Sequence, residues 1–515
     1  MASTVLSALS FDTPAAARAA AGYSEPVNLW SIVGFLWRGG FETDSLEVPS
    51  RGNGMSKEAL FGDLPEQASP PRPRGRPRLL EPERDQIELR AVDLESLIGA
   101  DHRARLFWAY AAGLDLSALE DAIAAREGTP GHPAITPRLL VALWLYATSE
   151  GIGSARALAR LCESHDAYRW LCGGVSVNHH TLADFRVGQG ALLDRLLGES
   201  VAALAGARLI DLDALAQDGV RVRASAGAAS FRRAATLEEH LAAAHEVVAA
   251  LKSEVDADPE ASNRRIKAAR ERAARERVAR VAGALAVLAE IERKKKAEGK
   301  PGAEPETPEA STSDAAPDAP QSQPEKKKKK KEPRASTTDP QARVMKMADG
   351  GFRPAYNVQV VSAAGEQIVV SVEPETIGSD RGLIRPALEQ VKARHGDLPT
   401  IHLADGGYIS AKDIEWAHRE NVAIHCPPSK SKHGTDPFKI RDDDGDGVRA
   451  WRARMASDAG QERYKDRAVC ECIHARWRGW GMRQFTVRGL PRVRAVVLWF
   501  ALVNNILQGK RMAAA

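Results

Sequence analysis

Residues 464–478 read YKDRAVCECIHARWR, and this stretch carries most of what the sequence says about fold and chemistry. On a helix, at about 100° per residue, Tyr464, Arg467, Glu471 and Arg478 fall within an arc of about 60°. One face would then present a phenol, two guanidiniums and a carboxylate. Such a face suits a phosphate beside a metal ion far better than it suits a hydrophobic core.

Asp218 is the first of two upstream aspartates that could join Glu471 at a metal ion. With Gly219 it forms a turn signal between two strand-like runs, residues 215–217 and 220–223. We therefore expect a hairpin there, with the carboxylate pointing out of the turn into an open site. Taken alone, an aspartate before a glycine is more often only a turn residue.

Asp405 is the second aspartate, in a glycine-rich turn at the end of a short apolar strand over residues 398–404. Carboxylates at strand ends and on a helix face are the oxygen ligands that Mg²⁺ takes in proteins. Two such ions, about 3.5–4 Å apart, can serve an in-line displacement at phosphorus. The alternatives are a structural turn at Asp405 and a surface ion pair between Glu471 and Arg467, one helical turn apart.

Length and composition set the frame for this chain of 515 residues, which predicts two to four domains. Hydrophobic residues make up 43% of it, enough for a core, and the net charge of +4 hides strong local patches. The five cysteines match no zinc or disulfide spacing, which favours reduced thiols in the cytoplasm. No run reaches the ~18 apolar residues of a membrane span, so we expect none.

The N-terminal 83 residues divide into two parts. Residues 1–54 differ in composition from the rest of the chain, and Met55 begins a typical protein start. We interpret 1–54 as a non-native or flexible extension. Residues 55–83 form a basic arm, in which Arg74 and Arg76 resemble the core of a minor-groove-binding hook. The alternative for these arginines is a basic loop that touches phosphates or nothing.

The next segment, residues 84–205, has a helical pattern. Thr136 before Pro137 is a helix start signal. Short helices joined by glycine-containing turns suit a helix-turn-helix-like DNA-binding unit, and equally any small bundle. His179 and His180 are adjacent, so on a helix they point about 100° apart and cannot both face one ion. A capping or packing role is favoured for them.

The remainder reads as one α/β unit in two pieces, residues 206–235 and 341–510, with an interruption between them. Residues 236–298 are helical and highly charged, and they read as a helical insertion. Residues 299–340 are rich in Pro, Ser, Ala, Glu and Lys and read as a disordered linker. Its uninterrupted lysine run, 326–331, either grips phosphates or is a solvated spacer.

Other acidic and aromatic residues offer weaker signals. The run at 442–447 imitates a calcium loop, but its twelfth position is Ala453, so we expect a polar loop. Asp349 and Asp380 are interpreted as loop or supporting residues. Three tryptophans could stack on a base or pack the core, and packing is favoured for the last of them: Trp477, Trp480 and Trp499.

The spacing of Tyr464, Arg467 and Glu471, followed by Arg478, resembles the tyrosine–arginine–glutamate–lysine signature of bacterial insertion-sequence DDE transposases. Arg478 stands where that family has lysine, so a planar fork replaces a point charge. Further segments resemble the family in the same order along the chain: 179–186, 218–224, 344–357 and 404–408. The resemblance spans roughly residues 56–510.

The resemblance implies an RNase H-like α/β catalytic core, interrupted by an insertion and preceded by an all-α domain. It implies that Asp218, Asp405 and Glu471 bind two Mg²⁺ or Mn²⁺ ions, with Tyr464, Arg467 and Arg478 on the DNA. It also implies cut-and-paste transposition. Water attacks the phosphodiester at each element end, and the freed 3′-hydroxyl attacks target DNA.

The same resemblance implies the partners: double-stranded DNA, both the terminal inverted repeats and the target, bound by a homodimer in the nucleoid of the bacterial cytoplasm. Two alternatives stay open. One is a divalent-metal nuclease that cuts without strand transfer. The other is a DNA-binding remnant that holds element ends without cutting, although all three carboxylates are intact.

Overall fold

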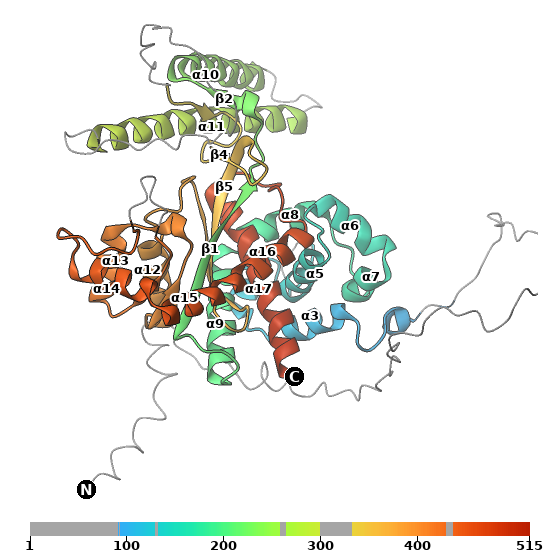
Figure 1. The fold of residues 1–515 in the computed structure, drawn as a ribbon. Coiled ribbons are helices and arrows are strands. Elements are labelled where there is room, and N and C mark those ends of the chain that lie inside the picture. Colours follow the sequence, from blue (N-terminus) through green and yellow to red (C-terminus); the bar gives the residue numbers. More distant parts are fainter. Residues whose placement is uncertain are drawn as a thin grey trace, which may run out of the picture.

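A computed structural model describes residue 91 and residues 93–128, 132–257, 264–298, 332–428 and 436–514 (Figure 1). Three predictions fall outside the described residues: the extension 1–54, the arm with Arg74 and Arg76, and the lysine run 326–331.

The described chain before residue 207 is helical, as its pattern predicts. Local signals explain where helices begin: Pro137 takes the first position of its helix, and the Ser154 hydroxyl accepts a hydrogen bond from the Ala157 N–H at the next one. The elements are η1 (Leu94–Leu97), α3 (Arg103–Ala112), α4 (Ser117–Asp121), α5 (Pro137–Ser149), α6 (Ala155–Ser164), α7 (Asp166–Cys172), α8 (His179–Gly188) and α9 (Gly190–Gly206).

A six-stranded mixed sheet forms the centre of the molecule, with strand order β4-β5-β1-β7-β8 and β6 paired to β5. Strand β1 runs antiparallel to β5 and parallel to β7, and β7 runs parallel to β8. The strands are β1 (Ala214–Arg223), β4 (Arg343–Lys346), β5 (Phe352–Ala363), β6 (Val369–Glu375), β7 (Ile401–Leu403) and β8 (Ala423–His425).

The hairpin predicted at Asp218 is wrong. Residues 214–223 form one continuous strand, and Asp218 lies opposite Val360 of β5. Gly219 serves close approach instead of a turn: a Cβ there would lie 2.5 Å from Gln359 Nε2 and collide with it. The glycine therefore lets side chains from β5 cross over β1 without bending the strand.

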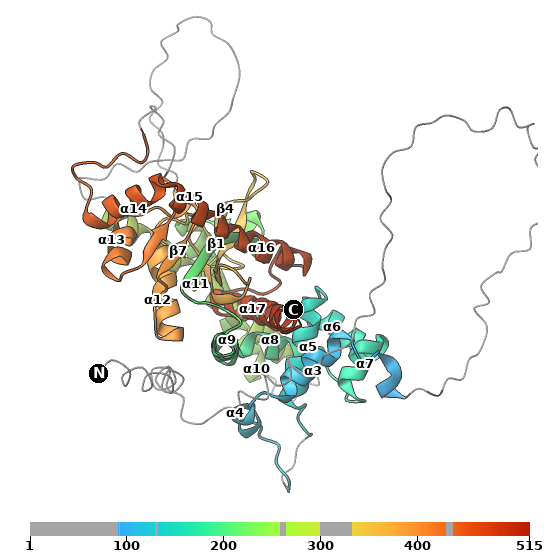
Figure 2. The same cartoon turned by 60° about the horizontal axis from the view of Figure 1, so that its bottom comes forward.

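Helices cover both faces of the sheet and one end of it. Figure 1 shows α10 and α11 as a long hairpin beyond the tips of β1, β4 and β5, reached through the small β2–β3 ribbon. Figure 2 shows the N-terminal helices grouped on the side away from α12–α14. The remaining elements are η2 (Ala228–Ser230), β2 (Phe231–Arg232), α10 (Ala234–Ala257), α11 (Arg264–Glu298), β3 (Ala335–Ser336), α12 (Ile384–His395), η3 (Gly406–Tyr408) and α13 (Ala411–Arg419).

The sequence pattern over residues 448–478 predicts a long helical stretch, and the structure divides it. The structure breaks it into α14 (Asp446–Ala456), α15 (Asp458–Tyr464), η4 (Lys465–Ala468) and α16 (Val469–Gly479). The first break has a local cause, because the Ser457 hydroxyl accepts a hydrogen bond from the Gly460 N–H and so caps a new helix.

The last helix, α17 (Leu490–Ala513), is buried as its apolar sequence predicts. By length and composition it could cross a membrane, yet 72% of its apolar window is buried within the protein. Its core cluster is continuous with Trp144 of α5, Val220 of β1 and Trp477 of α16. The helices before residue 207 and the sheet therefore share one hydrophobic core.

Two asparagines of α17 hold the start of strand β6. The side-chain amide of Asn505 accepts a hydrogen bond from the Val369 N–H and donates one to the Val369 carbonyl, both at 2.8 Å. Asn504 donates to the Gln367 carbonyl at 2.8 Å. These pairings explain why the apolar run carries two buried amides.

Candidate active site

Asp218 lies in the middle of β1, on the face that α16 covers. Side chains alternate along a strand, so it shares this face with Ala216 and Val220, which contact core residues of α16. Its Oδ2 accepts a hydrogen bond from Arg467 Nη1 at 3.2 Å, and its Oδ1 accepts one from the Gly219 N–H at 2.8 Å. The carboxylate is thus anchored at both oxygens.

The electrostatic setting of Asp218 favours its neutral form. Burial, with 17% of the side chain exposed, raises its pKa to about 6. The carboxylates of Asp405 and Asp380 push this pKa in the same direction, while the Arg467 guanidinium opposes them. A further positive charge beside Asp218 would therefore stabilise its ionised form.

Asp405 immediately follows Ala404 at the end of β7, as predicted. The parallel register pairs Ala216 with Leu403; Asp218 lies two residues further along β1, and Asp405 lies two residues past the end of β7 in extended backbone. Both aspartates therefore leave the sheet on the same face and at the same level. Asp405 Oδ1 accepts a hydrogen bond from the Gly407 N–H at 2.7 Å, which fixes the carboxylate at the start of η3.

Glu471 reaches this group through Arg467. Glu471 lies in the first turn of α16 with 64% of its side chain exposed, and its Oε1 accepts a hydrogen bond from Arg467 Nη2 at 2.8 Å. The surface pair weighed as an alternative is therefore present, but the same guanidinium also binds Asp218. One cation bridges two carboxylates that are far apart in sequence.

The other two members of the signature are Tyr464 and Arg478. Tyr464 ends α15, and its half-buried ring has the Arg467 guanidinium carbon 5.9 Å from its centroid. Arg478 is exposed near the end of α16. The 3-10 segment η4 lies between Tyr464 and Glu471, and the Arg467 guanidinium lies beside both the Tyr464 ring and the Glu471 carboxylate.

His474 belongs to the site although the sequence did not mark it. It lies one turn after Glu471 on α16, with Nδ1 3.6 Å from Asp218 Oδ2. Burial, followed by the charges of Arg478 and Arg467, lowers its pKa to about 4, so the ring is neutral. The spacing of three from Glu471 and seven from Arg467 was the available signal.

The opposite face of β1 carries a hydrogen-bonded polar network. Asp380 accepts hydrogen bonds from Asn357 Nδ2 at 2.6 Å, Gln359 Nε2 at 3.1 Å and Arg221 Nη2 at 3.1 Å. Three donors thus hold this carboxylate in place, as expected for the supporting residue that the sequence indicated.

The network continues beneath the sheet to the Asp405 turn. Gln359 Oε1 accepts hydrogen bonds from Tyr408 Oη at 2.6 Å and from Gln217 Nε2 at 2.9 Å. Gln217 Oε1 lies 3.0 Å from His402 Nε2. Since Tyr408 closes the turn that Asp405 opens, this network fixes the spacing between β1, β5 and that turn.

The carboxylate set suits a hard divalent cation, because all its donors are oxygens. In the described part of the chain, no three His, Cys, Asp or Glu side chains already converge as a metal-binding group. Here the Arg467 guanidinium stands between Asp218 and Glu471. A bound cation would take over at least one of those contacts.

The remaining candidates have structural roles. Asp444, from the calcium-like run, pairs with Arg452 at 2.8 Å in a polar loop, as predicted. Asp349 lies in an exposed turn and pairs with Arg353.

The rings of His179 and His180 lie with their centroids 4.1 Å apart at the start of α8. Core packing accounts for two tryptophans, each with no exposed surface: Trp477 and Trp499.

Comparison with known families identifies the chain. A family model of a transposase domain matches residues 92–187, and a model of the transposase DDE domain matches residues 311–506. The chain belongs to the insertion-sequence DDE transposases. In this transposase, Asp405 and Glu471 lie inside the second match, whereas Asp218 lies between the two. The searches of curated proteins and of solved structures gave no match.

Proposed function

We propose that this transposase cleaves DNA at the ends of its element and joins them to target DNA, using Asp218, Asp405 and Glu471 to bind two Mg²⁺ or Mn²⁺ ions. The observation that carries the proposal is the common face: two aspartates leave adjacent parallel strands at the same level, and Arg467 links one of them to Glu471.

The topology supports an RNase H-like catalytic core for this site. Three antiparallel strands, β6, β5 and β1, continue into two parallel ones, β7 and β8. The first aspartate lies on the central strand, the second follows its parallel neighbour, and the glutamate lies on a helix that covers the same face. The α10–α11 hairpin stands as an insertion between β1 and β5.

Bound divalent cations would supply positive charge to the attacking and leaving oxygens of an in-line displacement at phosphorus. Asp218 and Asp405 would hold them from a rigid sheet, and Glu471 from an exposed helix turn. Arg467, once its carboxylate partners bind cations, would be free to contact a DNA phosphate. Arg478 is exposed near the opposite end of α16 and would contact the backbone further along.

We also propose that the helices before residue 207 bind the terminal inverted repeats and that the active form is a homodimer on DNA. The match of this segment to a transposase domain supports the first part. Because these helices share their core with the sheet, DNA held by them would be presented to the carboxylates in one fixed geometry.

A strand-transfer assay tests the proposal. The purified full chain is incubated with Mg²⁺, labelled DNA from either flank of its gene and a target plasmid. A joined product with a freed 3′ end supports transposition. Cleavage without joining replaces the proposal with a nuclease, and end binding without cleavage replaces it with an inactive remnant.

A further inference from the structure

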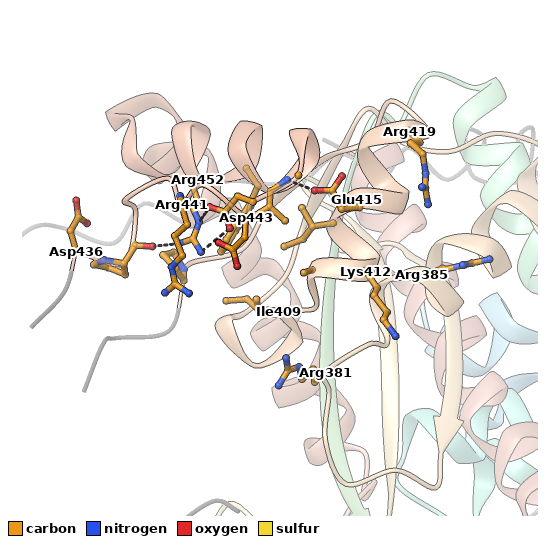
Figure 3. Close-up of a pocket in the computed structure, with 18 residues that line it drawn as sticks. Arg381, Arg385, Ile409, Lys412, Glu415, Arg419, Asp436, Arg441, Asp443 and Arg452 are labelled. Carbon is orange, nitrogen blue, oxygen red and sulfur yellow. Dashed lines mark hydrogen bonds and ion pairs between the residues drawn. The ribbon is translucent and has the colours of Figure 1, made fainter. Parts of the chain in front are cut away.

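A charged groove of about 920 Å³ lies next to the Asp405 turn, between α13 and the segment that leads into α14 (Figure 3). Ile409, one of its lining residues, directly follows η3, which Asp405 caps. Arg381, at the same end, directly follows Asp380 of the polar network. The groove therefore begins beside the residues that position the catalytic carboxylates.

Four cations in the groove are exposed and have no ion pair within the described residues. Figure 3 draws Lys412 and Arg419 on α13, with Arg441 across the groove from them. Arg381 is the fourth. Two further arginines are engaged elsewhere: Arg385 with Glu389 at 2.8 Å, and Arg452 with Asp444.

Four carboxylates line the groove beside its six cationic side chains, which leaves a net charge of +2. Glu415 accepts hydrogen bonds from the Val448 and Gly447 N–H groups and so caps α14. Asp444 is paired with Arg452, and Asp436 accepts a hydrogen bond from the Phe438 N–H at 2.9 Å. Glu415 and Asp436 keep their negative charges, because backbone hydrogen bonds do not neutralise a carboxylate. With Asp443 they make three carboxylates against the four cations that have no ion pair within the described residues, so the groove keeps a small positive excess that favours an anion.

We propose that this groove holds the sugar–phosphate backbone of DNA, without regard to sequence, as it passes the catalytic carboxylates. The inference rests on the proposed function, since it names where that site's substrate continues. Lysine and arginine contacts to phosphates position DNA but carry no sequence information. Arg419 and Arg441 stand on different segments, as a backbone lying between two walls requires.

The test is the salt dependence of DNA binding by the full chain. For duplex DNA, log affinity falls linearly with log salt concentration, and each phosphate contact makes this slope more negative by about 0.9. The variant Lys412→Ala/Arg419→Ala/Arg441→Ala should make that slope shallower by about 2–3. We expect this on a short duplex of unrelated sequence and on DNA from the gene's flanks.

The matched control removes three cations elsewhere in the same domain. Lys346→Ala/Lys510→Ala/Arg511→Ala lowers net charge equally, and these side chains lie outside the groove. Its slope should stay at the wild-type value. An unchanged slope in the groove variant on the unrelated duplex, or an equally shallower slope in the control, overturns the proposal. A slope that becomes shallower only on the flank DNA also overturns it, because the groove would then read a particular sequence.

These outcomes separate the groove from the catalytic proposal. If wild-type protein joins ends to target but the groove variant keeps its full salt slope, only the groove assignment fails. If wild-type protein neither cleaves nor joins while the slope becomes shallower as expected, the groove stands and the catalytic proposal fails.

Discussion

The two faces of strand β1 treat charge in opposite ways. On one face, Asp218 is partly buried, shares Arg467 with Glu471, and has its pKa raised to about 6. On the other, Asp380 accepts three hydrogen bonds, one of them from Arg221. The first face leaves negative charge in need of a cation, and the second holds the strands at fixed spacing. The incompletely neutralised carboxylate thus identifies the candidate active site, and the hydrogen-bonded polar groups on the other face hold its strands in position.

The largest expected effect is on catalysis. Asp405→Asn should lower DNA cleavage by at least about 10³-fold while leaving binding to end DNA nearly unchanged, because the amide keeps the size but not the charge of a metal ligand. Cleavage assays and gel-shift titrations measure the two effects. Asp349→Asn, in an exposed turn, is the matched control and should cleave normally. A parallel collapse of DNA binding would make Asp405 structural.

The next largest effect concerns the close packing over Gly219, on the face of β1 that carries Asp380. Gly219→Ala would put a Cβ 2.5 Å from Gln359 Nε2 and 2.8 Å from Asp380 Oδ1. We expect a loss of about 2–4 kcal/mol in the free energy of unfolding, seen as a lower urea midpoint. At Gly206 a Cβ would meet nothing within 4 Å, so Gly206→Ala should be neutral or stabilising. Equal midpoints for the two variants would remove the steric argument.

The partly buried charge itself should lower the stability of the metal-free protein. The pKa of Asp218 is raised from 3.8 to about 6, so the folded state binds more protons, and stability falls as pH rises between those values. Asp218→Asn should therefore gain up to about 2–3 kcal/mol above pH 6 and nothing below about pH 4. Thermal unfolding in EDTA across this pH range measures the gain.

Two comparisons sharpen that experiment. Mg²⁺ should raise the unfolding temperature of the wild type more than that of Asp218→Asn, since the variant lacks one ligand. Asp349→Asn should show no gain at neutral pH, because its hydrogen bond with Arg353 lowers the pKa of Asp349. An Asp218→Asn protein that is no more stable at pH 7.5 than at pH 4, relative to wild type, would contradict the interpretation that the Asp218 carboxylate is incompletely neutralised.

The smallest expected effect concerns the supporting face. Tyr408→Phe removes the hydrogen bond to Gln359 and should cost about 1 kcal/mol of stability, because Gln359 Oε1 keeps Gln217 as a donor. Tyr168 has a buried hydroxyl that finds no hydrogen-bond partner among the described residues, so Tyr168→Phe should cost nothing. Urea unfolding compares the two. An equal loss in both variants would mean that the network contributes no specific stability.

Signals that act over a few residues allowed correct predictions. The strand-like patterns over residues 356–361 and 367–372 coincide with β5 and β6, and the helical pattern over 383–394 coincides with α12. The carboxylate at the end of β7 was predicted for the same reason, since a buried strand followed by Asp405 and glycines is a local pattern.

The errors arose where distant residues decide the outcome. Asp218 before Gly219 reads locally as a turn, but the glycine admits side chains from β5, such as Gln359, which is 142 residues from its partner Gln217. The bridge from Arg467 to Asp218 spans 249 residues, and no periodicity encodes it. His474 was missed because its spacing from Glu471 and Arg467 places it on the same helix face but does not reveal that Asp218 lies beneath that face.

The amide of Asn505 has a consequence for how this protein behaves among its own copies. The Asn505 side chain pairs with both the N–H and the carbonyl of Val369, the first residue of β6, on the side where an added strand would pair. An exposed strand margin of this kind is a template for intermolecular stacking. A chain that ended before residue 505 would uncover it, so the final turns of α17 also act as a guard against aggregation.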